Sequence, residues 1–278
     1  MDYKRILTIQ DISCFGQCSM TVALPILSAC GVETVIIPSA VLSTHTGGFT
    51  GFTFRDLSED IPAIAAHWKK EGIDFDAIYT GYLGSEKMID MVTDIFNTLS
   101  RPNCKKIVDP AMADNGMLYY GFDEAYASAM TRLCKNADIV LPNITEACFM
   151  TGFEYKEKYD EGYVKALLSE LDAIGMKDIV LTGVSYDEKT TGVVVKTERG
   201  IEYYCHRRLP VGSHGTGDVF ASAFSGALLR GKNELGAARV AANYTLRCIE
   251  NTAGDESHRY GVKFETASPY LLEELNKE

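Results

Sequence analysis

Short apolar segments rich in β-branched residues alternate with longer segments of helical periodicity along most of this chain. The segment 4–11 (KRILTIQD) is followed by 20–30 (MTVALPILSAC), where the helical pattern stops before Gly31. The same pair of patterns recurs as far as 177–185 (KDIVLTGVS). Strands separated by helices favour a mainly parallel sheet that is covered by helices on both faces. The alternation therefore predicts an α/β fold of three layers, α-β-α.

The pattern changes in the last third of the chain. The segment 190–208 (TTGVVVKTERGIEYYCHRR) predicts an antiparallel hairpin that turns at Arg199-Gly200. Two alanine-rich helical segments and a short C-terminal helix follow. We find no linker that divides the sequence, and 278 residues suffice for one large core. We expect a single domain over residues 1–278.

Charge and composition exclude several classes of function. The formal net charge of −11 opposes nucleic-acid binding, which depends on a basic surface. No segment approaches the ~20 continuous apolar residues of a membrane span, and the N-terminal sequence MDYKRILTIQD lacks the plan of a secretory signal. The eight cysteines include no CxxC pair, which favours reduced thiols over disulfides or zinc. We expect a cytoplasmic protein.

Polar or small residues follow nearly every predicted strand. The carboxyl ends of parallel strands meet at one edge of a sheet, and ligands bind there. The residues expected at this edge are Asp11, the Thr44–Gly48 loop, Tyr82, Asp109, Asn143 with Glu146, Thr182 and the Gly215–Asp218 turn. Any one of them could instead cap a helix or shape a turn. Their occurrence after so many strands indicates a binding site.

The turn GTGD at 215–218 leads directly into a helical segment of small residues. Gly215 and Gly217 would let backbone amides approach a phosphate without a Cβ in the way, and Thr216 can add a hydroxyl. A carboxylate at Asp218 conflicts with anion binding unless it faces an acceptor alcohol. Phosphoryl transfer needs both charge stabilisation and a group that accepts the proton of the attacking hydroxyl. The turn therefore predicts a clamp with Asp218 as base; the alternative is that Asp218 only favours the helix start.

A phosphate donor with several negative charges also needs a cation. Asp109 in IVDPAMADNG and Glu146 in LPNITE both follow predicted strands, and hard oxygen ligands suit Mg²⁺. Asn143 and Glu146 have the spacing of a helix capping box as well, with Asn at the N-cap and Glu three residues later. Both interpretations of this pair stay open at this point.

These motifs carry a family resemblance. GTGDVFAS, VDPAMADNG and LPNITEA together resemble the ribokinase-like superfamily. More narrowly, TIQDISCFGQCS, LSTHTGG and IYTGYLG precede them in the order of the pyridoxal/pyridoxamine kinase family, so the resemblance runs from about residue 5 to about residue 250. It implies ATP-dependent phosphorylation of the 5′-hydroxyl of pyridoxal, pyridoxamine or pyridoxine. It also implies a homodimer with a minimal lid that uses Mg²⁺ with ATP, often with K⁺ beside it.

The resemblance implies roles for particular residues. Asp218 matches the catalytic base. The anion hole is matched by Gly215, Thr216 and Gly217. The positions matched around Mg²⁺ and the ATP phosphates are Asp109, Asn143 and Glu146, of which Asp109 and Glu146 are on the metal side. Thr182 matches a nucleotide-side threonine, and Tyr119 a tyrosine that folds over the phosphates. The pyridine pocket is matched by Asp11, His45, Thr46, Gly47 and Tyr82.

Three positions depart from the family pattern. Asp11 stands where many pyridoxal kinases carry serine, Ala113 replaces a frequent glycine, and Leu141 occupies a position that often carries threonine. An aspartate at position 11 could accept a hydrogen bond from a ring N–H or a phenol. Such a contact suits a pyridine ligand but does not select among the vitamers.

Several other functions are weighed against this one. A hydroxymethylpyrimidine kinase of thiamine synthesis shares the fold and a similar turn, but tends to carry cysteine at the position of Asp218. A non-catalytic binding protein on the same fold would not need that base. A sugar kinase needs room for an inserted sheet near the first helix, and a dinucleotide-dependent oxidoreductase would want GxGxxG where CFGQCS has one glycine.

Overall fold

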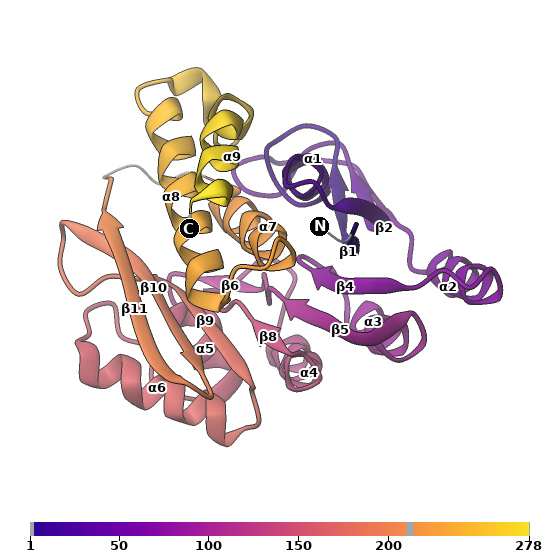
Figure 1. Ribbon diagram of the computed structural model, residues 1–278, viewed down its shortest axis with the longest axis horizontal. Coiled ribbons are helices and arrows are strands. Elements are labelled where there is room, and N and C mark those ends of the chain that lie inside the picture. The colour runs from indigo at the N-terminus through magenta and orange to yellow at the C-terminus, as the bar shows by residue number, and fades with distance from the viewer. Residues whose placement is uncertain (1–2, 210–213, 278) are drawn as a thin grey trace.

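The computed structural model describes residues 3–209 and 214–277. A nine-stranded sheet runs through this part of the chain in the order β11-β10-β9-β8-β5-β4-β1-β2-β3 (Figure 1). The strands are β1 (Arg5–Ser13), β2 (Glu33–Leu42), β3 (Phe54–Asp56), β4 (Phe75–Thr80), β5 (Ser100–Val108), β8 (Ile139–Val140), β9 (Asp178–Val184), β10 (Thr190–Thr197) and β11 (Gly200–Arg207). Six neighbouring strands of the sheet, β9, β8, β5, β4, β1 and β2, pair in parallel. The outer strands β3, β10 and β11 pair antiparallel with their neighbours. The predicted, mainly parallel sheet is confirmed.

Helices cover both faces of this sheet (Figure 1). One face packs against α1 (Met20–Ala29), α7 (Thr216–Leu229), α8 (Glu234–Thr252) and α9 (Ser268–Asn276). The other packs against α2 (Ile61–Lys70), α3 (Glu86–Thr98), α4 (Glu124–Lys135), α5 (Ile144–Thr151) and α6 (Glu161–Ala173). Because side chains alternate along a strand, Ile78 of β4 faces one layer and Tyr79 the other. The central strands are therefore apolar on both sides, as a buried parallel sheet requires.

Three short strands escape prediction from the sequence. β3 has three residues, all exposed, and β6 (Ala113–Asp114) and β7 (Met117–Leu118) form a separate small hairpin. Segments this short carry no usable periodicity. The larger hairpin β10–β11 is confirmed, but its turn lies at Glu198-Arg199, one residue before the predicted Arg199-Gly200, because Gly200 already pairs with Thr197.

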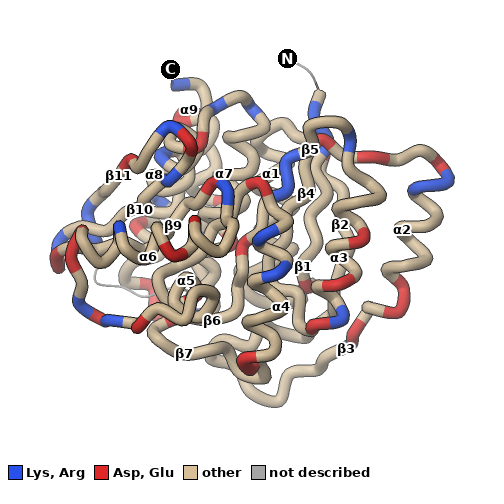
Figure 2. Tube along the Cα trace, turned by 90° about the horizontal axis from the view of Figure 1, so that it is seen from below, with Lys and Arg blue, Asp and Glu red and all other residues tan. Residues whose placement is uncertain are grey.

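Charged residues of both signs are spread over the outer elements of the fold (Figure 2). Figure 2 shows Lys and Arg interspersed with Asp and Glu along the outer helices and loops, and no continuous basic stripe appears in that view. Among residues 3–209 and 214–277, no helix has both the length and the apolar character that a membrane crossing demands.

The topology fixes where polar side chains can gather. β1, β4, β5 and β8 run in parallel, so their carboxyl ends meet at one edge of the sheet. The register of β1 against β2 shifts between Gln10 and Ile12, so Asp11 lies opposite an irregularity where β2 carries one extra residue. Bulges re-aim a side chain and are common beside functional sites. α7 begins at the same edge, with Gly215 as its N-cap.

Candidate active site

A cavity of about 1160 Å³ opens at this edge of the sheet. Each site residue predicted from the sequence lines it: Asp11, His45, Thr46, Gly47, Tyr82, Asp109, Tyr119, Asn143, Glu146, Thr182, Gly215, Thr216, Gly217 and Asp218. These residues come from loops and strand ends spread over more than 200 positions of the sequence. The fold alone brings them together.

The glycine turn at the start of α7 is shaped by close contacts. Gly215 has a φ of 76°, and a Cβ there would lie 1.8 Å from the backbone oxygen of Gln17. Only glycine fits that position. Gly217, by contrast, has open space where a Cβ would stand. The first amides of a helix have no partner within the helix, so this turn presents N–H donors and the positive end of a helix dipole to the cavity.

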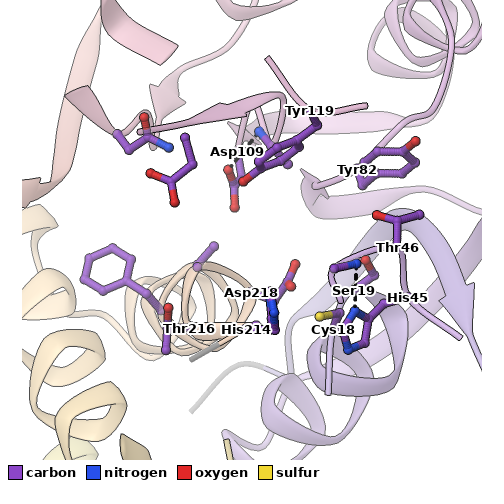
Figure 3. A pocket seen from close by; sticks show the side chains of 18 of the residues that line it. Cys18, Ser19, His45, Thr46, Tyr82, Asp109, Tyr119, His214, Thr216 and Asp218 are labelled. Atoms are coloured by element: carbon purple, nitrogen blue, oxygen red, sulfur yellow. Dashed lines mark hydrogen bonds between the residues drawn. The ribbon is translucent and has the colours of Figure 1, made fainter. Parts of the chain in front are cut away.

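Asp218 lies in the first turn of α7, as predicted, and its side chain is half-buried at the cavity. Figure 3 shows it pointing into the cavity between Asp109 on one side and Ser19 and His45 on the other. Burial raises the pKa of Asp218 from 3.8 to about 7, although the backbone N–H of Ser19 lowers it in part. A carboxyl group with a pKa near 7 can both take up and release a proton at physiological pH.

Two further carboxylates lie across the cavity from α7. Burial raises the pKa of Asp109 well above its ordinary value, and the charges of Glu146 and Asp218 raise it further. Burial also raises the pKa of Glu146 from 4.5 to about 7. Among the described residues that line the cavity, none is Lys or Arg. A bound cation would reduce the repulsion between these carboxylates, which have no basic partner in the lining.

The contacts of Glu146 are mostly structural. Its Oε2 accepts a hydrogen bond from the backbone N–H of Asn143 at 2.9 Å, and the side chain of Asn143 accepts one from the N–H of Glu146 at 2.9 Å. This reciprocal pair confirms the capping-box interpretation. Oε1 accepts a third hydrogen bond from the N–H of Met112 at 3.0 Å. The N–H of Ala113 also binds this carboxylate, so three of its four acceptor positions are used and one remains for a cation or a metal-bound water.

These ligands fit Mg²⁺, which water and phosphate help to coordinate, better than a metal ion that is coordinated by protein side chains alone. In the described part of the chain, no three Asp, Glu, His or Cys side chains are arranged to hold a metal ion by themselves. Mg²⁺ usually keeps several waters and binds one or two carboxylates together with substrate phosphates. Asp109 and Glu146, with Asn143 nearby, match that mode of binding.

The opposite end of the cavity combines a buried acid with aromatic side chains. Asp11 is 4% exposed, and its Oδ2 accepts a hydrogen bond from the hydroxyl of Ser13 at 2.9 Å. Burial raises the pKa of Asp11, while the hydroxyls of Ser19 and Ser13 lower it. The ring of Tyr82 stacks on that of Phe122, with the centroids 5.3 Å apart. This end suits a small, flat ligand with polar substituents.

Several residues that line the cavity could not be identified from the sequence. Ser19 caps α1 with a φ of 53°, a left-handed conformation that is rare for a residue with a side chain. At the end near the β10–β11 hairpin the lining includes Thr191, Gly192, His206 and Thr245. Gly192 offers the one local signal, since glycine inside a strand often marks a close approach. A Cβ there would lie 2.0 Å from the backbone oxygen of Tyr204.

Comparisons with known proteins agree with this geometry. The family model described as phosphomethylpyrimidine kinase matches residues 20–262. A crystal structure from Bacteroides thetaiotaomicron, provisionally described as a phosphomethylpyrimidine kinase and obtained in a form with pyridoxal, is 35% identical. It superposes with a TM-score of 0.91 over 97% of this chain and 96% of that one.

Two pyridoxal kinases are also similar over most of their length. The crystal structure of pyridoxal kinase from Lactobacillus plantarum is 31% identical, with a TM-score of 0.89 over 97% of each chain. The pyridoxal kinase of Dictyostelium discoideum is 26% identical over 250 residues, which cover 83% of this chain and 80% of that protein. The resemblance found in the motifs is confirmed: this chain belongs to the phosphomethylpyrimidine kinase family and shares the ribokinase-like fold of the pyridoxal kinases that it matches.

Proposed function

We propose that this protein transfers the γ-phosphoryl group of ATP to the 5′-hydroxyl of a B6 vitamer. One observation carries the proposal: the amide turn of α7, Asp218, and the acidic pair Asp109 and Glu146 all line the same cavity. Phosphoryl transfer requires anion donors, a proton acceptor and a cation around a single transfer line. The 35% identical relative, whose crystal form contains pyridoxal, supports the choice of substrate class.

In this mechanism Asp218 is the general base. Its carboxylate accepts the proton of the 5′-hydroxyl as the oxygen attacks the γ-phosphorus, and the bond from that phosphorus to the bridging oxygen of ADP breaks. The products are the 5′-phosphate of the vitamer, ADP and a proton held by Asp218. The amides of Gly215, Thr216 and Gly217 donate to the phosphoryl oxygens and stabilise their charge. The raised pKa of Asp218 suits a group that must give up this proton again.

The acidic end of the cavity would hold the cation that accompanies the nucleotide. Asp109 and Glu146 would bind Mg²⁺ directly or through water, and Asn143 would orient this pair. The ion supplies neutralising charge to the phosphates. Thr182 on β9 would contact the nucleotide, and Tyr119, exposed beside Asp109 in Figure 3, would fold over the phosphates. A K⁺ ion beside Mg²⁺ is part of the same proposal and rests on the family resemblance.

The vitamer would lie at the other end, among Asp11, His45, Thr46, Gly47 and Tyr82. The partly exposed ring of Tyr82 can stack against a pyridine, and Asp11 can accept a hydrogen bond from a ring substituent. We propose further that residues 1–278 act as one domain and that the enzyme is a homodimer. All eight cysteines are free thiols, which fits a reducing compartment such as the cytoplasm.

A second candidate is phosphorylation of hydroxymethylpyrimidine. It is favoured by the description of the matching family and by that of the 35% identical structure. Both substrates present a hydroxymethyl group on a nitrogen heterocycle, so the same base and anion turn would serve either reaction. The proposals differ only in the ring that the Asp11 end accepts.

A coupled ADP-release assay distinguishes these two candidate functions. Purified protein with MgATP would be offered pyridoxal, pyridoxamine, pyridoxine, hydroxymethylpyrimidine and ribose in parallel. We expect the highest kcat/KM with one of the three B6 vitamers. ADP release with hydroxymethylpyrimidine alone would support the second candidate, and release with none of the five would contradict both.

A further inference from the structure

The ring of His45 does not offer its nitrogens to the cavity that it lines. Its Nδ1 accepts a hydrogen bond from the backbone N–H of Gly47 at 3.1 Å. Its Nε2 lies 2.9 Å from the backbone oxygen of Tyr260 and must donate to it, because a carbonyl only accepts. These two contacts together select the neutral tautomer protonated at Nε2. Since both nitrogens are occupied, His45 has no free polar atom for a ligand.

These contacts join three segments that are far apart in the sequence. The backbone N–H of His45 donates to the oxygen of Phe15 at 3.2 Å, and the N–H of Gln17 donates to the oxygen of Tyr260 at 3.2 Å. The rings of Phe15 and Tyr260 lie 4.6 Å apart. The 14–17 loop, the 45–49 loop and the 258–261 turn therefore meet around one imidazole.

The packing around this ring is tight. A Cβ on Gly16, whose φ is 122°, would lie 2.0 Å from Cδ2 of His45. A Cβ on Gly47 would lie 2.7 Å from Nδ1 of His214, the residue just before the amide turn. The rings of His45 and His214 are themselves 5.3 Å apart. Gly47 is thus held between the ring of His45, which accepts its N–H, and the ring of His214. This packing fixes the loop that carries Thr46 and Gly47.

We propose that His45 is a positioning residue: as a neutral imidazole it fastens the 45–49 loop over the vitamer end of the cavity, and protonation releases it. The inference rests on the proposed function, because it concerns how that site holds its acceptor substrate. A second proton on Nδ1 would turn the acceptor of the Gly47 N–H into a donor, so that hydrogen bond must break.

The charged surroundings of His45 favour the neutral ring. Burial lowers its pKa below 6.5, the carbonyl of Tyr260 raises it in part, and His214 lowers it further. Arg259 lies over the ring of Phe49, which packs against His45, and His258 packs against Tyr260. The groups on these segments are cationic or neutral, and the carboxylates that line the same cavity nearby are those of Asp11 and Asp218. The hydrogen bonds that fasten the loop are therefore present at neutral pH and are lost as the pH falls below 6.5.

The experiment compares wild type with His45→Gln and His45→Ala. Glutamine offers one acceptor and one donor, as the neutral imidazole does, and does not titrate. At pH 8 we expect the KM for the vitamer to stay within about threefold of wild type in His45→Gln. It should rise about 10- to 100-fold in His45→Ala, which loses two hydrogen bonds, while the KM for ATP changes little. Between pH 8 and pH 5.5 the vitamer KM of wild type should rise more than that of His45→Gln, by at most about tenfold because the pKa of His45 lies below 6.5.

Comparison at each pH cancels the titration of Asp218 and of the vitamer, which both variants share. Hydrogen exchange at pH 8 gives a readout that needs no substrate: His45→Ala should lose protection at the amides of Gly47 and Gln17, and His45→Gln should retain it. A shared pH profile for wild type and His45→Gln, or full protection in His45→Ala, would overturn the inference. Wild type that phosphorylates no vitamer at pH 8 would instead overturn the proposed function and leave the exchange result to decide the role of His45.

Discussion

Replacing Asp218 by asparagine should lower activity and raise stability at the same time. Asparagine has nearly the same shape as aspartate but accepts no proton. Loss of a general base lowers kcat by ~10²–10⁴. The variant should keep its affinity for MgATP, because the amides of the turn belong to the backbone and remain in place.

The gain in stability follows from the raised pKa of Asp218. In the unfolded chain the carboxyl group ionises near 3.8, whereas in the folded protein it ionises at about 7. The folded state therefore binds the proton more tightly, and the contribution of Asp218 to the free energy of unfolding falls as the pH rises from 4 to 7. This difference corresponds to at most about 4 kcal/mol at pH 8, and partial exposure of the side chain reduces it to roughly 1–3 kcal/mol.

Two assays check this prediction. Steady-state turnover with saturating MgATP and vitamer gives the change in kcat. Urea unfolding at pH 4 and pH 8, without nucleotide or Mg²⁺, gives the stabilities. Asp218→Asn should match wild type at pH 4 and exceed it by 1–3 kcal/mol at pH 8. Near-normal turnover would refute the assignment of the base, and equal stabilities at pH 8 would refute the account of its burial.

Three further predictions follow from the same site. Gly215→Ala should abolish activity and destabilise the protein, because its Cβ would lie 1.8 Å from the backbone oxygen of Gln17. The matched control is Gly217→Ala, whose Cβ meets no atom within 4 Å, so that this variant should unfold at the wild-type temperature. Thermal unfolding of both variants tests this, and equal melting temperatures would contradict it. Glu146→Gln should raise the Mg²⁺ concentration needed for half-maximal activity and leave the vitamer KM unchanged; an unaltered metal titration counts against its role at the cation. In the native protein Cys14 and Cys205 are exposed and should react first with a thiol reagent, ahead of the five buried thiols of Cys30, Cys104, Cys134, Cys148 and Cys248; rapid reaction of those five would show that the core is open.

The sequence predicts the layers of this fold well, because periodicity is a local property. The apolar segments that become β1, β4 and β9 and the helical patterns between them are visible without coordinates. β3 and the β6–β7 hairpin are not, because two or three residues show no period. Their formation depends on neighbours in space, such as the pairing of β3 with β2.

The residues that line the cavity could also be predicted, since parallel strands end at one edge of the sheet. What each residue does there depends on contacts that the sequence does not show. Glu146 caps α5 and faces the cavity at once, so two competing interpretations both apply to it. His45 lines the predicted pocket, yet its nitrogens bind the backbone of Gly47 and Tyr260. Ser19 carried no signal at all, because nothing in the sequence marks this serine as a residue with a positive φ.

Direct identification of the product tests the central claim, namely that one cavity holds both the phosphoryl donor and a B6 hydroxymethyl group. The protein would be incubated with MgATP and each vitamer, and the mixture followed by ³¹P NMR and mass spectrometry. The account predicts a new phosphate monoester on the 5′-oxygen, formed in equal amount with ADP and formed ~10²–10⁴-fold more slowly by Asp218→Asn. Release of inorganic phosphate without a phosphorylated vitamer would contradict it.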